Sequence, residues 1–125
     1  MFDHLSLGVR DLDAARRFYD AFFAPLGASL ASEKPGEIAY GPGGTAGLFY
    51  LYPVSGDQVA GLGAHLAFTA DSRAAVDEAY RQAMEHGATT IRAAGPHPDI
   101  AAGYYGCVIL DPDGNKLEIV AGTMH

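Results

Sequence analysis

The segment that decides the fold is His4-Leu5-Ser6-Leu7-Gly8-Val9, because it recurs in the second half of the chain as His65-Leu66-Ala67-Phe68-Thr69-Ala70. A run with helical periodicity follows each copy and ends at a glycine, Gly27 in the first and Gly87 in the second. A repeated strand-helix unit places equivalent side chains in equivalent positions. We therefore expect the two leading histidines to occupy matching places in two related modules, from which a pseudo-twofold axis would let them converge on one point.

Composition limits the classes of function that this sequence supports. A chain of 125 residues with 49% hydrophobic and 18% charged residues fits one globular domain. Its net charge of −7 argues against nucleic acid and anionic membranes as partners. Cys107 is the only cysteine, which favours the reducing cytoplasm. The sequence shows neither a membrane-spanning run nor a signal peptide pattern.

Alternation of apolar residues predicts strands, and helical spacing predicts a helix after each repeated segment. Asp11 and Asp71 are the candidate N-caps of these two helices. Further strands are expected at about 28–32, 36–41, 46–53, 89–93, 103–110 and 115–121, after initial strands at 4–9 and 63–69. The sequence therefore predicts one α+β domain over residues 1–125. Its two βαβββ modules, about 1–60 and 61–125, would form a curved mixed sheet around a central cavity.

Glu118 stands in the middle of an otherwise apolar final strand. If its neighbours Leu117 and Ile119 face a helix, Glu118 faces the opposite side, which is also the side of His4 and His65. Buried glutamates are rare unless they are paired or bound to a metal. An ion pair with Lys116 or Arg92 is the alternative. Two imidazoles and one carboxylate on a common face predict a divalent metal site.

Tyr50 takes the position in the first module that Glu118 takes in the second. Three ligands and one phenol leave coordination positions open, as in catalytic metal sites. Tyr50 is a candidate hydrogen-bond donor or general acid. His97 lies in a proline-rich loop that is either a lid or a simple connection. Tyr104 is placed beside the cavity if residues 108 and 118 pair, although a shifted register would place Tyr105 there instead.

The repeat, the opening segment 3–12 with Phe18-Tyr19, and the closing segment 105–118 with its Asp-Pro-Asp-Gly-Asn turn resemble the vicinal oxygen chelate superfamily. This superfamily includes glyoxalase I, bleomycin-resistance and fosfomycin-resistance proteins, and extradiol dioxygenases. The resemblance implies paired βαβββ modules and a divalent metal held by His4, His65 and Glu118. Glyoxalase I has a second glutamate in the position of Tyr50, whereas the fosfomycin-resistance enzymes and extradiol dioxygenases use two histidines and one glutamate.

Two functions follow as expectations. The first is a metal-dependent lyase, isomerase or ring-cleaving oxygenase that acts on a small oxygenated substrate. It would use Fe²⁺, Mn²⁺, Ni²⁺, Zn²⁺ or Mg²⁺ as a Lewis acid, with Tyr104 or His97 contacting substrate. The alternative is a metal-free drug-binding protein, in which Tyr50 and Tyr52 stack on a flat ligand. The resemblance and a short apolar strand near 46–53, taken as a sheet edge, predict a homodimer.

Overall fold

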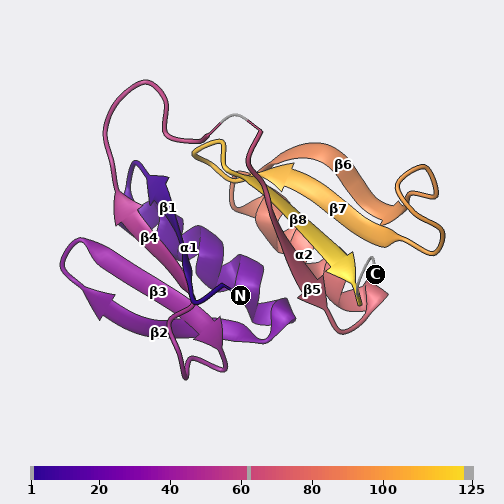
Figure 1. Ribbon diagram of the computed structural model, residues 1–125, viewed down its shortest axis with the longest axis horizontal. Helices are drawn as coiled ribbons and strands as arrows, with labels where there is room; N and C mark the ends of the chain where they lie inside the picture. The colour runs from indigo at the N-terminus through magenta and orange to yellow at the C-terminus, as the bar shows by residue number, and fades with distance from the viewer. Residues whose placement is uncertain (1, 62, 123–125) are drawn as a thin grey trace.

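The chain folds into two modules that have the same order of strands and helix, and the two modules lie side by side in space (Figure 1). The computed structural model describes residues 2–61 and 63–122. The first module consists of β1 (Leu5–Val9), α1 (Leu12–Phe23), a 3-10 turn (Ala24–Leu26), β2 (Ala28–Lys34), β3 (Glu37–Pro42) and β4 (Phe49–Pro53). The second consists of β5 (Leu66–Ala70), α2 (Arg73–Glu85), β6 (Thr89–Pro96), β7 (Tyr105–Leu110) and β8 (Lys116–Ala121).

The two modules have the same sheet topology, which confirms the predicted α+β fold with two βαβββ units. Their strand orders are β1-β4-β3-β2 and β5-β8-β7-β6, and in each the first strand runs parallel to the last. The connection through α1 carries the chain from β1 at one edge of the sheet to β2 at the other, and β4 then takes the place between β1 and β3. The expectation that residues 46–53 form a sheet edge is therefore wrong.

The strands form two four-stranded sheets rather than one continuous curved sheet. Within the described part of one chain the strands do not close a barrel around a central cavity. The helices lie against one face of each sheet, because alternate strand residues such as Phe49 contact the aromatic side chains of α1. We call the opposite face of each sheet, which carries Tyr50 and Glu118, the open face.

The helix N-termini are set by side-chain caps. The Asp11 carboxylate accepts the backbone N–H groups of Asp13 and Ala14 at 2.9 and 3.1 Å, as expected for an N-cap. In the second module the cap is Ser72 and not the predicted Asp71, because Ser72 is the extended residue directly before the first helical residue. Its hydroxyl accepts the N–H of Ala75 at 3.1 Å. Among the described helices, neither is long and apolar enough to span a membrane.

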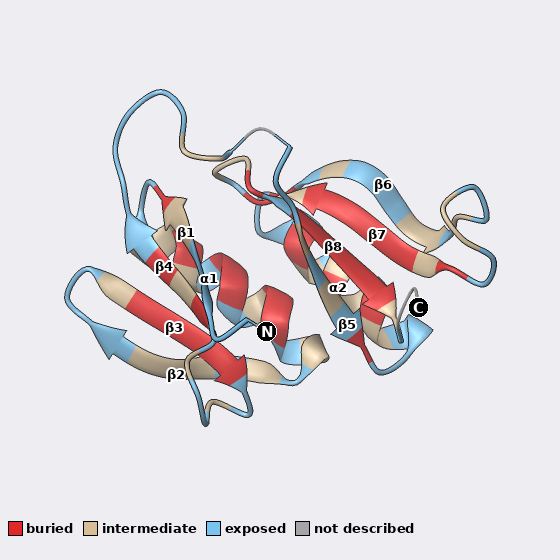
Figure 2. Ribbon diagram, viewed as in Figure 1, coloured by how far each residue is buried: buried red, intermediate tan, exposed pale blue. Residues whose placement is uncertain are grey.

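An aromatic cluster packs the modules together. Phe68 on β5 lies with its ring centroid 5.9 Å from that of Phe22 and 5.2 Å from that of Phe23, both on α1. Phe49 of β4 completes the contact at 5.8 Å from Phe68. Buried positions accordingly concentrate on the helices and on β3, β7 and β8 (Figure 2). Burial of aromatic surface is the main favourable contribution to the association of the modules.

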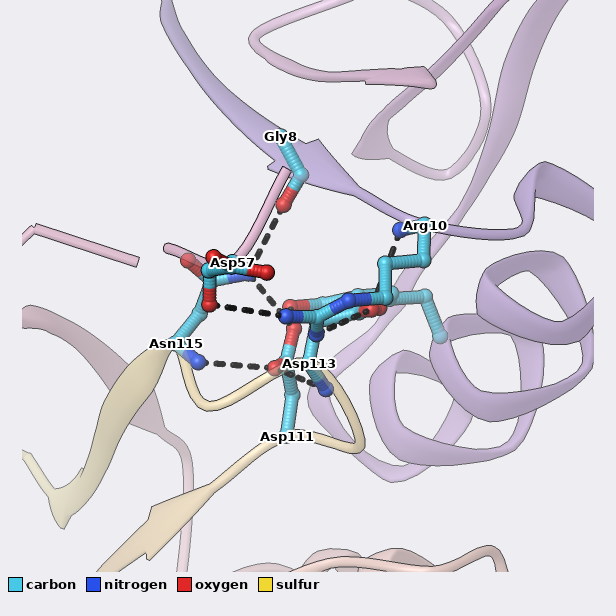
Figure 3. A network of polar contacts seen from close by, with 7 residues as sticks. Gly8, Arg10, Asp57, Asp111, Asp113 and Asn115 are labelled. Carbon is cyan, nitrogen blue, oxygen red and sulfur yellow. Dashed lines mark hydrogen bonds and ion pairs between the residues drawn. The ribbon is translucent and has the colours of Figure 1, made fainter. Parts of the chain in front are cut away.

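A buried polar cluster at the β7–β8 turn also joins the modules (Figure 3). The Asp111 carboxylate accepts hydrogen bonds from the Tyr19 hydroxyl on α1 at 2.7 Å and from the Asn115 side chain at 3.0 Å. The Asn115 amide nitrogen also donates to the carbonyl oxygen of Gly8 on β1 at 3.0 Å. These bonds satisfy side chains that would be costly to bury alone, so they favour one relative placement of the modules.

Candidate functional site

The strand register places the candidate site residues in equivalent positions of the two modules. Ser6 pairs with Tyr50 in the first sheet, and Ala67 pairs with Glu118 in the second. The predicted equivalence of Tyr50 and Glu118 is thus confirmed. The two histidines lie just before β1 and β5 rather than inside the strands, because strand pairing begins at the following leucine in each module.

Glu118 has two side-chain partners, and neither of them is Lys116 or Arg92. Its Oε2 lies 3.4 Å from Nε2 of His65, and its Oε1 accepts a 2.8 Å hydrogen bond from the Tyr104 hydroxyl. The Glu118 residue is 7% exposed, whereas the His65 side chain is 48% exposed. Arg92 pairs with Asp99 instead, at 2.8 Å. The carboxylate is therefore enclosed on one side and open toward His65 on the other.

Tyr104 and Tyr105 face opposite sides of the second sheet. Val108 pairs with Glu118, as the hairpin register required, and Tyr104 is buried on the open face. The Tyr105 hydroxyl donates to Asp77 of α2 at 2.6 Å. Burial, followed by the hydrogen bond to Glu118, raises the pKa of Tyr104, so that its hydroxyl stays protonated and donates at neutral pH.

The hydrogen bond between Tyr104 and Glu118 was not predicted from the sequence. The signal that points to this bond is Gly106, which lies beneath the tyrosine ring. A Cβ atom at Gly106 would lie 2.7 Å from the Tyr104 hydroxyl, so a glycine at this strand position allows the ring to lie along the sheet.

The first module carries a separate cluster around His4. The His4 ring contacts Tyr50 edge-on with ring centroids 5.4 Å apart, and its Nδ1 lies within hydrogen-bond distance of the Asp3 carboxylate. Tyr50 stacks on Tyr52 at 6.3 Å and an interplanar angle of 11°. Over the described residues, the Tyr50 hydroxyl makes no side-chain hydrogen bond, whereas that of Tyr52 donates to Glu37 at 3.0 Å. Tyr50 thus retains a hydroxyl with which to bind a ligand.

His97 lies in the loop between β6 and β7, next to Tyr104. The two rings are 5.9 Å apart, and Nε2 of His97 lies 2.8 Å from the carbonyl oxygen of Ala93. The backbone N–H of His97 also donates to the Tyr104 carbonyl at 3.4 Å, which closes the loop on itself. His97 therefore borders the second-module cluster through Tyr104, and its roles as a lid and as a substrate contact stay predictions.

One chain does not gather the predicted metal ligands. No group of three histidine, cysteine, aspartate or glutamate side chains within residues 2–61 and 63–122 is arranged to hold a metal ion. His65 and Glu118 lie together, while His4 belongs to the Tyr50 cluster of the other sheet. The separation arises because β1 and β5 belong to different sheets.

The cavity that touches His65 includes none of the other candidate site residues. It measures about 80 Å³ and lies where Leu7 of the first module faces Leu66 and Lys116 of the second. Ligand sites for small molecules usually measure about 300 Å³ or more. Larger cavities of about 390 and 550 Å³ lie elsewhere, along α1 and β2, and include none of the candidate ligands.

The spacing of His65 and Glu118 is that of two ligands on one divalent metal, whereas His4 lies apart from them. Two ligand atoms that are each about 2.1 Å from one ion lie about 3.4 Å apart at a tetrahedral angle, and this is the observed separation of His65 Nε2 from Glu118 Oε2. The contact of His4 Nδ1 with Asp3 is the arrangement common to metal-binding histidines, which bind through one ring nitrogen and donate the other to a carboxylate.

Comparison with known proteins assigns the family. The profile of the Glyoxalase/Bleomycin resistance protein/Dioxygenase superfamily matches residues 1–119, and the chain belongs to this superfamily. An uncharacterized protein of Pseudomonas aeruginosa is 33% identical over 128 aligned positions that cover 95% of this chain and 86% of the relative.

Solved structures show the same fold. A glyoxalase/bleomycin resistance protein from Albidiferax ferrireducens superposes with a TM-score of 0.83 at 28% identity, covering 98% of this chain and 99% of that one. A fosfomycin resistance protein from Mesorhizobium loti superposes with a TM-score of 0.72 at 18% identity, covering 99% and 93% respectively. The second likeness concerns the fold alone.

Proposed function

We propose that this protein is a metal-dependent enzyme that acts on a small oxygenated substrate. The observation that carries the proposal is the 3.4 Å separation between His65 Nε2 and the Oε2 of the largely buried Glu118. A buried carboxylate next to an imidazole is stabilised by a shared cation, and the pair matches the spacing of two ligands on one ion. Its membership of a superfamily that includes metal enzymes supports this interpretation.

We propose further that two copies of the chain complete each site. His4 is the third predicted ligand; its side chain is 55% exposed and it lies beside Tyr50 at the open face of the first module. His65 and Glu118 lie at the open face of the second. A twofold dimer that sets the first module of one copy against the second module of the other would unite the three ligands twice. None of the cavities described within a single copy brings His4, His65 and Glu118 together, which is in keeping with a site that two copies complete.

The residues of the chain then have distinct roles. A bound divalent ion would polarise a substrate oxygen as a Lewis acid. Two imidazoles among the ligands favour Fe²⁺, Mn²⁺, Ni²⁺ or Zn²⁺ over Ca²⁺. A site that keeps open coordination positions also suits Mg²⁺. Tyr50, whose hydroxyl bonds to no other side chain among residues 2–61 and 63–122, would donate a hydrogen bond or a proton to the substrate. His97 would contact substrate from the β6–β7 loop. The proposed reaction is that of a lyase, an isomerase or a ring-cleaving oxygenase.

Metal titration of the purified protein tests the proposal. We expect about one tightly bound Mn²⁺, Zn²⁺ or Ni²⁺ per chain by calorimetry, because two chains share two sites. The variant His65→Ala should lose this binding, whereas His86→Ala should not, since His86 lies exposed at the end of α2. Wild-type protein without tight metal binding, or equal binding by His65→Ala, would contradict the proposal.

A metal-free ligand-binding protein is the second candidate function. The observation in its favour is the near-parallel stack of Tyr50 and Tyr52, of which Tyr52 is 38% exposed and available to a flat ligand. A thermal-shift screen separates the two functions, because a ligand stabilises the folded state to which it binds. Stabilisation by metal ions favours the enzyme, and stabilisation by aromatic compounds alone favours the ligand-binding protein.

A further inference from the structure

The two carboxylate oxygens of Glu118 have different partners. Oε1 accepts a 2.8 Å hydrogen bond from the Tyr104 hydroxyl, and Oε2 faces Nε2 of His65. A carboxylate that has both oxygens available can bind a metal through one or both of them. The hydrogen bond from Tyr104 engages Oε1, the oxygen that is not the one next to His65. The second oxygen is therefore the one presented to a cation beside His65.

Tyr104 is held in this position from three directions. Its residue is 5% exposed, and its ring lies over Gly106, where a Cβ atom would come within 2.7 Å of the hydroxyl. Its backbone N–H donates to the carbonyl of Ala101 at 3.1 Å, and its carbonyl accepts from the N–H of His97. Packing and backbone hydrogen bonds already restrict the Tyr104 side chain, so it loses little conformational entropy when its hydroxyl bonds to Glu118. It can therefore hold Glu118 in one rotamer.

We propose that Tyr104 is a positioning residue that makes Glu118 bind the metal through Oε2 alone. This inference rests on the proposed metal site and adds to it, because it gives Tyr104 a role in metal binding rather than in contact with substrate. Binding through one carboxylate oxygen leaves one more coordination position for substrate oxygens than binding through two.

The variant Tyr104→Phe tests the inference, because it keeps the ring and removes only the hydroxyl. We expect its affinity for Zn²⁺ to fall by about 10- to 100-fold in calorimetric titration, because loss of a hydrogen bond to a metal ligand typically weakens metal binding by this factor. The matched control is Tyr105→Phe, whose hydroxyl bonds to Asp77 on the other side of the sheet. It should bind Zn²⁺ as the wild type does.

A spectroscopic measurement separates positioning from a general loss of stability. With Co²⁺ in place of Zn²⁺, the visible absorption bands report the geometry and number of ligands. Tyr104→Phe should change the band pattern, because Glu118 is then free to bind through both oxygens. The Tyr105→Phe bands should match those of the wild type. Unchanged bands and affinity in Tyr104→Phe would overturn the inference.

The outcomes distinguish this inference from the proposed function. Absence of tight metal binding in the wild type would remove the metal site itself, and this inference with it. Equal Zn²⁺ affinity and equal Co²⁺ bands in the wild type and Tyr104→Phe would remove only the role of Tyr104. If Tyr104→Phe does not fold, a crystal structure of the Zn²⁺-loaded wild type decides: one Glu118 oxygen on the metal with the Tyr104 bond kept supports the inference, and two oxygens on the metal contradict it.

Discussion

The Tyr19 hydroxyl on α1 donates a 2.7 Å hydrogen bond to the Asp111 carboxylate in the β7–β8 turn, and this bond links the two modules inside the chain. Both residues are buried. The same turn leads directly into β8, the strand that carries Glu118. The bond therefore helps to set where the second open face lies relative to the first.

Loss of this bond should destabilise the fold. We expect Tyr19→Phe to lower the free energy of unfolding by about 1–3 kcal/mol, because the Asp111 carboxylate loses a donor in a buried place. Urea denaturation followed by circular dichroism measures the change. The control Tyr52→Phe removes a hydroxyl that bonds to Glu37 at the surface and should cause no measurable change. Equal effects of the two substitutions would show that the buried bond has no special role.

Substitution of Gly106 should be far more harmful than substitution of its strand partner Gly95. A Cβ atom at Gly106 would lie 2.3 Å from the carbonyl oxygen of Ile119, whereas none of the atoms around Gly95 lies within 4 Å of a Cβ built there. We expect Gly106→Ala to cost about 1–3 kcal/mol of stability through overpacking, and Gly95→Ala to leave the midpoint of urea denaturation nearly unchanged. A stable Gly106→Ala protein with wild-type Zn²⁺ affinity would contradict the packing described for Tyr104.

The thiol of Cys107 should be unreactive in the folded protein. Burial raises its pKa to about 12, and the residue is fully buried in the core between β7 and α2. Because only the thiolate reacts with disulfide reagents, raising pH from 7 to 9 should leave labelling slow, with full labelling only in denaturant. The measurement is the absorbance change with a thiol-specific aromatic disulfide. Rapid stoichiometric labelling of the native protein would show that this strand is not packed as described.

Local sequence patterns were enough to predict the modules and much of each half of the site. The alternation around Glu118 left Tyr104 and Tyr105 as alternatives for the open face, and the pairing of Val108 with Glu118 decides for Tyr104. The repeat correctly paired Tyr50 with Glu118. These are properties of one strand and its neighbour, for which the period of two fixes the face. The cap at Ser72 was missed because Asp71 and Ser72 are both good N-cap residues and only the backbone decides between them.

The relative placement of the modules was not predictable in the same way. Whether His4 meets His65 depends on how Phe68 packs against α1 and on the Tyr19–Asp111 bond, which join segments far apart in the sequence. No periodicity encodes such contacts. For the same reason, the sequence did not indicate that β4 pairs on both edges.

The central claim is a metal site shared by two copies of the chain. It is tested most directly by mixing two variants that each lack one metal ligand. His4→Ala lacks the ligand of the first module, and His65→Ala lacks a ligand of the second, so neither homodimer should bind Zn²⁺ tightly. In a mixed dimer isolated through two different affinity tags, one site combines the intact His4 of one chain with the intact His65 and Glu118 of the other. We predict about one tight Zn²⁺ per mixed dimer, half the wild-type number. A mixed dimer that binds no Zn²⁺ tightly would contradict the shared site.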